Sequence, residues 1–315
     1  MRKVILVSAI ICASMLAGAC THSPSLVVTT APAVSEPMSA PQPTERPMQE
    51  SGPTKTPEET PVPVKGTITV RGGDTLERDI IPQLCNVFAL AEEPVKEMLS
   101  EAKSRLISDS LTGFRRMEGI IVPGRYEVTN ETLSDYIALW ITGAEQRFDS
   151  LLTACAEPNG LKAYEQLTLA SIVDWECLSD EFQAEAAAVL LNRLNKGDKL
   201  QCCATVEYAL GYSRPYLTSD DIKVQSDYNT YTCKGLPPGP ICVVDEQSLA
   251  AGIGRSVDSS LYFFFYDYAP ETLQVFSDYS AFKEKAKISK QKFLDKYDIG
   301  KYDMVDKRSY FFKTE

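Results

Sequence analysis

The sequence has almost no histidine: His22 is the only one among 315 residues. A Ser-His-Asp triad, a Cys-His pair and a histidine-based zinc site all need an imidazole within the folded part of the chain. His22 lies beside the apolar N-terminal segment, in a stretch whose composition indicates no fold. Any chemistry must therefore depend on carboxylates, hydroxyls, thiols or backbone groups.

Positive charge is also scarce. The chain has 32 Lys and Arg against 43 Asp and Glu, which gives a net charge of −11. Such a chain gains little from releasing counterions from a phosphate backbone, so nucleic acid is not expected as a partner. Hydrophobic residues make up 44% of the sequence, enough for a substantial core, and the length allows one or two domains.

Residues 1–20 have the pattern of a secretory signal. A positively charged start at Met1–Lys3 precedes Val4–Ala19, which is almost wholly apolar or small. The run is short for a membrane span, which needs about 20 apolar residues. Its end, Leu16–Cys20, resembles a bacterial lipobox, in which Cys20 becomes a lipidated N-terminus. A plain cleaved signal and an uncleaved single-pass anchor are the alternatives. All three interpretations place the rest of the chain outside the cytoplasm. A lipid or an uncleaved anchor would also hold it at the cell membrane.

Residues 21–65 are predicted to be a disordered tether. Ten of the 19 prolines lie here, and Ser, Thr and Glu fill most of the gaps. Such a segment cannot bury enough apolar surface to offset its ordering entropy. An extended, partly polyproline chain of this length reaches up to roughly 140 Å, which would let a membrane-held domain enter the cell wall.

Residues 66–115 are predicted to form a small αβ module that looks LysM-like. Residues 116–290 follow as a mixed α/β domain, and 291–315 as a C-terminal helix and tail. The expected elements are a strand at Thr67–Val70, a turn at Gly72–Asp74, a helix from Thr75, a helix at about Glu93–Leu106, a strand-turn-strand pattern at Gly119–Val128, and a helix capped by Thr132 that reaches about Thr153.

A glutamate ends the apolar stripe of a helix predicted at Tyr164–Cys177. Leu169, Ile172 and Val173 occupy positions i, i+3 and i+4, and Glu176 occupies i+7. Apolar surroundings would raise the pKa of this carboxyl group, and a glutamate that keeps its proton near neutral pH can act as a general acid. The pattern equally allows Glu176 to mark the helix end and point to solvent.

A second helix is predicted after it, ending at Lys196–Asp198. Ser179 or Asp180 would cap its start, with Gln183 completing a capping box. Asn192 lies near its C-terminal end beside Arg193, where capping and surface charge are as plausible as a role in a site.

A series of short motifs then runs in order through the second half of the chain. It consists of Leu169–Glu176, Ala188–Leu194, Leu200–Gln201, Thr205–Val206, Tyr208–Leu210, Tyr228–Tyr231, Gly235–Ile241, Leu261–Phe263 and Val275–Ser277. The ordered set resembles the YceG-like family of endolytic murein transglycosylases, over residues 119–285 and most strongly over 167–283.

The resemblance implies a lyase that cleaves the MurNAc–GlcNAc bond of peptidoglycan strands without water and leaves 1,6-anhydromuramic acid ends. Glu176 aligns with the family's catalytic glutamate. The implied fold is α+β, with the LysM-like module before a mixed α/β catalytic domain of the YceG-like type. Glycan strands would be the substrate and cell-wall synthases candidate partners; no cofactor is implied.

Six residues are candidates for substrate binding. Aromatic faces and amides in Tyr228–Tyr231 suit sugar rings and N-acetyl groups, although a structural turn is an equal alternative. Gly235–Gly239 would form a rigid wall of the cleft. Gln201 and Thr205 could bond sugar hydroxyls or merely cap a helix. The candidate set is Asn192, Gln201, Thr205, Tyr228, Asn229 and Tyr231.

The chain departs from the family pattern at three places. Asp174 replaces a glutamate two residues before Glu176, and Leu273–Gln274 replaces a Gly-His pair. Cys202–Ala204 stands where the family has Ser-Asp-Pro, which removes an aspartate that would cap a helix or contact a sugar, and a proline at the first helical position. This last change favours an alternative function, a non-catalytic peptidoglycan-binding lipoprotein that keeps the fold.

Nine cysteines are present, and seven of them follow Cys20. Seven is odd, so at least one is unpaired. Disulfides that involve Cys177, Cys233 or Cys242 are possible in an exported protein. Buried thiols and a cysteine-only zinc site are the alternatives, but the adjacent Cys202 and Cys203 lack the usual ligand spacing, and no metal ligand is assigned.

Overall fold

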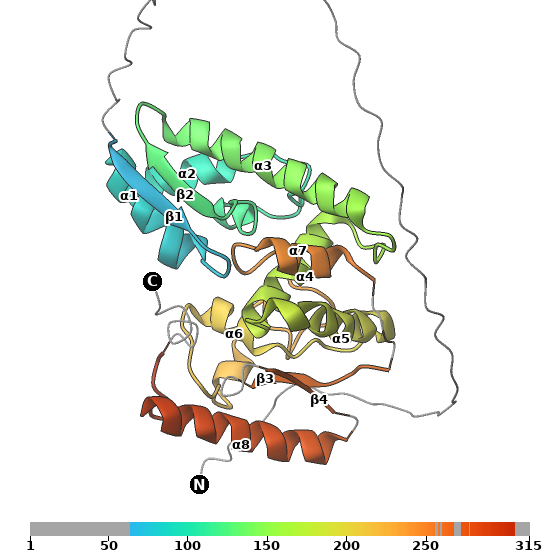
Figure 1. The fold of residues 1–315 in the computed structure, drawn as a ribbon. Helices are drawn as coiled ribbons and strands as arrows, with labels where there is room; N and C mark the ends of the chain where they lie inside the picture. Colours follow the sequence, from blue (N-terminus) through green and yellow to red (C-terminus); the bar gives the residue numbers. More distant parts are fainter. Residues whose placement is uncertain (1–63, 256–257, 259, 268–271, 277, 306–315) are drawn as a thin grey trace, which may run out of the picture. The chain divides into compact units, whose positions relative to one another are not determined.

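The computed structural model describes residues 64–255, 258, 260–267, 272–276 and 278–305. The predicted signal with Cys20, His22 and all but the last two residues of the tether lie outside this part. The described residues form a helix-rich structure with two small antiparallel sheets (Figure 1). This confirms the predicted α+β class.

The first elements are a strand, a helical turn and two helices. They are β1 (Gly66–Val70), η1 (Leu76–Ile80), α1 (Ile81–Phe88) and α2 (Glu92–Glu101). The second helix ends five residues before the predicted Leu106. Its chain turns away because Glu145 of the next long helix accepts hydrogen bonds from the Ser104 hydroxyl at 2.6 Å and the Arg105 N–H at 3.1 Å.

Only one strand forms within the predicted strand-turn-strand segment. It is β2 (Gly124–Val128), which follows the short turn η2 (Phe114–Met117) and pairs antiparallel with β1, Ile68 opposite Tyr126. The expected first strand fails because Gly119 takes a φ of +76°, and a Cβ there would lie 2.8 Å from Pro240. Ile120 then enters the core instead of a sheet.

The long helix α3 (Leu133–Ala154) begins where the sequence predicts. Thr132 and Asp135 form a capping box, in which each side chain accepts the backbone N–H of the other residue. Trp140 and Phe148 of this helix enter a core with residues from β1, α1 and α2.

Helix α4 (Ala163–Glu176) is buried on almost every side, so the predicted single apolar stripe was too narrow. Its residues belong to two cores, because Leu167 and Ala170 pack with the first and Leu169, Ile172 and Val173 with a second. Helix α7 (Glu246–Ile253) packs closely on it. Gly252 makes this possible, since a Cβ would lie 2.6 Å from the Gln166 carbonyl oxygen.

The next helices surround the C-terminal end of α4. They are η3 (Asp180–Phe182), α5 (Gln183–Lys196), α6 (Cys203–Leu210) and η4 (Asp221–Lys223). Gly197 ends α5 at a φ of +68°, as predicted. The predicted capping box at its start is wrong: no side chain caps η3, and the Gln183 amide donates to the Cys177 carbonyl instead.

The described part of the chain ends with a hairpin and a helix. Strand β3 (Phe264–Asp267) pairs antiparallel with β4 (Thr272–Val275), and α8 (Tyr279–Tyr297) follows. The helix begins twelve residues before the predicted boundary at 291 because the Asp278 side chain caps it, accepting the Ala281 N–H. Among the described residues, no helix is both long and apolar enough to span a membrane.

Candidate active site

Glu176 is the last residue of α4, and its carboxylate points to the start of α6. Its Oε1 accepts the backbone N–H of Ala204 at 3.0 Å, and the side chain is half-buried. Of the two orientations that the pattern allowed, the structure has the one directed into the protein. The group stays partly accessible, as a proton donor to a ligand must be.

The sequence of α6 explains this contact. Cys202 stands at the N-cap position, and its side chain makes no capping bond. The first N–H groups of a helix need an acceptor, and the helix dipole favours a negative charge there. Glu176, which belongs to helix α4, supplies the acceptor and the negative charge. It therefore takes the place of the missing side-chain cap of α6.

Buried thiols and a phenol surround the carboxylate. Burial raises the pKa of Cys177 to about 12 and holds that of Cys202 well above its usual range, with the charge of Glu176 acting in the same direction. Burial likewise keeps Tyr231 protonated, and its hydroxyl lies 3.3 Å from the Cys203 Sγ. Cys177, Cys202 and Tyr231 are therefore neutral at physiological pH and place no charge of their own beside Glu176.

Asp174 serves a different contact. It is buried, and its Oδ2 accepts the Asp245 N–H at the start of α7 at 3.0 Å. Its carboxylate also lies near the Gly72 turn, 3.4 Å from where a Cβ would stand. Asp174 therefore holds the turn and α7 against α4 rather than sharing a face with Glu176.

Four of the predicted substrate-binding residues are committed to internal hydrogen bonds. The Asn192 amide donates to the Asp258 and Leu261 carbonyls, each at 2.8 Å. Asn229 is fully buried and bonds three backbone groups of its own loop. Both side chains therefore hold loops in place.

Thr205 and Tyr231 are similarly enclosed. Thr205 is fully buried and bonds the Cys202 carbonyl and the Thr230 hydroxyl, both at 2.9 Å. Gln201 and Tyr228 differ because both are partly exposed. Gln201 takes a φ of +56°, and the Tyr228 ring packs on Tyr208 at 4.9 Å between centroids.

Arg193 is buried as well, which excludes the surface-charge interpretation. Its Nη1 donates to the Leu200 carbonyl. Together with the Gln201 N–H, which donates to the Thr230 carbonyl at 3.1 Å, it fixes the segment that leads into α6. The start of α6, and hence the partner of Glu176, is set by these long-range bonds.

The proline-rich wall lies at the other end of α4. Gly235–Pro238 lines a pocket of about 740 Å³ with residues 161–165 and Thr168. These residues lie at and just before the beginning of α4, whereas Glu176 is its last residue. The segment therefore lines a pocket at the opposite end of α4 from Glu176, and its place in the wall of the substrate cleft stays a prediction.

Sequence reasoning missed Glu118, which is fully buried. Its Oε1 accepts the Leu76 N–H at 3.0 Å, and its Oε2 accepts the Tyr208 hydroxyl at 2.9 Å. Loss of water raises the pKa of Glu118 to about 7, although both hydrogen bonds act against the rise. Its place in the apolar run from Met117 to Ile121 was a signal that could have found it.

The cysteines of the described residues form no disulfide. Cys177, Cys202 and Cys242 are buried, and Cys242 donates to the Ser171 carbonyl at 3.3 Å. Within the same described residues, no three side chains of His, Cys, Asp or Glu come together in a way that could hold a metal ion. The disulfides and the zinc site that the sequence allowed are thus not found there.

A sequence model of the YceG-like family matches residues 54–288. The chain belongs to this family. A yceG-like protein from Listeria monocytogenes has a similar structure, with a TM-score of 0.59 at 22% identity over 72% of this chain and 77% of that one. At this identity the likeness supports the shared fold alone.

Two relatives carry the name endolytic murein transglycosylase. The protein from Streptococcus pneumoniae (strain ATCC BAA-255 / R6) is 28% identical over 223 residues, which are 64% of this chain and 40% of that protein. The protein from Bacillus subtilis (strain 168) is 30% identical over 149 residues, 47% of this chain and 41% of that one. The matched part thus spans about two-fifths of the length of these relatives.

Proposed function

We propose that the chain is an endolytic lytic transglycosylase that cleaves the MurNAc–GlcNAc bond within peptidoglycan strands. The observation that carries this proposal is the half-buried carboxylate of Glu176, held by the Ala204 N–H at 3.0 Å. Membership of the YceG-like family and the name of its relatives support the substrate class.

The first step is cleavage of the glycosidic bond. Protonated Glu176 donates its proton to the bridging oxygen, and the bond from that oxygen to the anomeric carbon of MurNAc breaks. Because Glu176 ends a rigid helix buried between two cores, its position needs little reorganisation.

The second step closes the ring. Glu176, now a carboxylate, accepts the proton of the 6-hydroxyl on the same MurNAc, whose oxygen bonds the anomeric carbon to give the 1,6-anhydro end. Hydrolytic glycosidases need a second carboxylate as nucleophile or base. Here an attached hydroxyl replaces it with the advantage of an intramolecular reactant, which agrees with the turning away of Asp174.

The Ala204 N–H should tune this acid. A hydrogen bond to the carboxylate favours its ionised form, so Ala204→Pro, which removes only the donor, should let Glu176 keep its proton to higher pH. We expect the alkaline limb of the pH–activity profile to move up by about one pH unit. Proline is tolerated in the first turn of a helix, and Pro82 already occupies the second position of α1.

Ala204→Ser keeps the N–H and is the matched control. Its alkaline limb should coincide with that of the wild type. An unchanged profile in a folded Ala204→Pro variant would show that this bond does not tune the catalytic acid.

The N-terminal segments would bring this activity to the wall. We infer lipidation of Cys20, a tether at residues 21–65, and a LysM-like module at 66–115 that adds glycan affinity at the outer face of the cell membrane.

Cys20→Ser should move the protein from the membrane fraction to the soluble or secreted fraction. A variant that stays in the membrane fraction would favour the uncleaved single-pass anchor. Synthases that make the glycan are the candidate partners.

A second candidate function is peptidoglycan binding without cleavage. The observation that favours it is the missing side-chain cap at Cys202, which leaves Glu176 occupied with α6. Incubation of purified sacculi with the protein separates the two. Soluble fragments support the enzyme, whereas protein bound to intact sacculi with no released fragments supports the binding function.

A further inference from the structure

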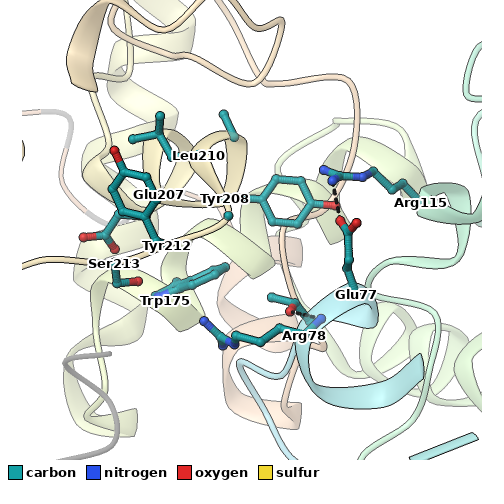
Figure 2. A pocket seen from close by; sticks show the side chains of 12 residues that line it. Glu77, Arg78, Arg115, Trp175, Glu207, Tyr208, Leu210, Tyr212 and Ser213 are labelled. Atoms are coloured by element: carbon teal, nitrogen blue, oxygen red, sulfur yellow. Dashed lines mark hydrogen bonds and ion pairs between the residues drawn. The ribbon is translucent and has the colours of Figure 1, made fainter. Parts of the chain in front are cut away.

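A second pocket borders the Glu176 site along α6. It encloses about 470 Å³, a size typical of small-ligand sites, and residues from η1, η2, α4 and α6 line it (Figure 2). Trp175, the neighbour of Glu176, forms part of its wall. Glu207 and Tyr208 lie about one helical turn along α6 from Ala204, which holds Glu176.

The charges that line this pocket are balanced. Arg115 forms an ion pair with Glu77 at 2.6 Å, and Arg78 pairs with the neighbouring Asp79 at 3.0 Å. Glu207 adds a buried carboxylate. A strongly charged ligand would meet like charge on one side or the other, so the lining favours a neutral ligand that both donates and accepts hydrogen bonds.

Two aromatic rings, Trp175 and Tyr208, both less than a tenth exposed, and a buried hydroxyl also line the pocket. The Arg78 guanidinium lies 5.8 Å from the Trp175 ring centroid, and that of Arg115 lies 5.1 Å from the Tyr208 centroid. The Ser213 side chain lines the pocket, is 5% exposed, and its Oγ has no hydrogen-bond partner among the described residues. A buried hydroxyl without a partner is unfavourable, and a hydrogen bond to a ligand would remove that cost.

We propose that this pocket binds an N-acetylhexosamine unit of the glycan, next to the sugars at the scissile bond. Aromatic faces, balanced charge and a free-standing hydroxyl suit a neutral polyhydroxylated ring better than the acidic peptide of peptidoglycan. This inference rests on the proposed function for its substrate class. Under this assignment Trp175 and Ser213 are binding residues. Arg78, which belongs to the predicted module at residues 66–115, becomes part of the substrate cleft.

The chain provides its own reporter for the test. It has two tryptophans, and Trp140 is fully buried in the first core, so a ligand-dependent change in emission reports Trp175. The full chain carrying Glu176→Gln, which prevents turnover, is titrated with tri-N-acetylchitotriose and followed by emission and calorimetry. The Trp175→Phe variant lacks the reporter and is followed by calorimetry alone. We expect saturable binding, at least about fivefold weaker when Ser213→Ala is added and tenfold weaker with Trp175→Phe.

Ser110→Ala is the matched control, because Ser110 lines the pocket at the other end of α4. Its affinity for the trisaccharide should be unchanged. A parallel titration uses the stem tetrapeptide of peptidoglycan; binding of the peptide in place of the sugar, or sugar binding unaffected by Ser213→Ala and Trp175→Phe in folded proteins, would overturn the assignment.

The two proposals fail separately. If the wild type releases glycan fragments while the trisaccharide leaves the emission unchanged, the subsite is wrong and the enzyme stands. If the trisaccharide binds through Ser213 and Trp175 but the wild type releases nothing, the subsite stands and the transglycosylase function is wrong.

Discussion

Replacing Glu176 with Gln is expected to lower fragment release from peptidoglycan by about a thousandfold or more. A positioned general acid typically contributes 10²–10⁴-fold, and in the proposed mechanism one carboxyl group serves as both acid and base. The glutamine amide has no proton to give at neutral pH. Its oxygen can still accept the Ala204 N–H, which lies 3.0 Å from the carboxylate, so the loss should be chemical rather than structural. Initial rates of fragment release measure it.

Glu185→Gln is the matched control, because Glu185 is an exposed glutamate in the first turn of the following helix. It should retain the wild-type rate. Thermal unfolding checks that the Glu176 variant keeps its fold. A Glu176→Gln protein that releases fragments at the wild-type rate would exclude this residue as the catalytic acid.

Glu118 should make the stability of the fold depend on pH. Its pKa is about 7 in the folded protein, against an ordinary value of 4.5, because it is buried. The folded state therefore binds this proton more tightly than the unfolded state. The stabilisation is complete below pH 4.5 and is lost as the pH rises through 7. Between pH 5 and 8 we expect the free energy of unfolding to fall by about 2 kcal/mol.

Glu118→Gln should abolish this slope and leave the protein more stable than the wild type at pH 8. The amide resembles the protonated acid, since it can accept the Leu76 N–H and donate to the Tyr208 oxygen. Exposed Glu97→Gln on α2 is the control and should keep the wild-type slope. Urea unfolding at several pH values measures it; a slope that persists in Glu118→Gln would assign the pH dependence elsewhere.

The sequence predicted those helix ends that are set by contacts between residues only a few positions apart. Thr132 is the predicted cap, its partner Asp135 lies three residues on, and α3 begins directly after Thr132 as predicted. Gly197 ends α5 for a similar reason, because glycine takes the left-handed conformation without a Cβ clash. The position of Glu176 on α4 followed from the helical period.

The site was less predictable because its partners are distant in sequence. Asn229 suits a sugar by residue type, but its amide is used by the Ile222 and Val224 carbonyls of its own loop. The role of Glu176 as a cap for α6 depends on a contact 28 residues away. Glu118 and Tyr208 meet across 90 residues. The hydrophobic periodicity of a single segment carries no information about contacts between residues so far apart in the sequence.

The most direct test of the central claim is the chemistry of the new glycan ends. Purified peptidoglycan is digested by the full chain in water enriched in ¹⁸O, and the released fragments are analysed by mass spectrometry. Intramolecular attack driven by Glu176 predicts 1,6-anhydromuramic acid ends that carry no ¹⁸O. Reducing MurNAc ends labelled with ¹⁸O would show that water is the nucleophile and contradict the transglycosylase mechanism.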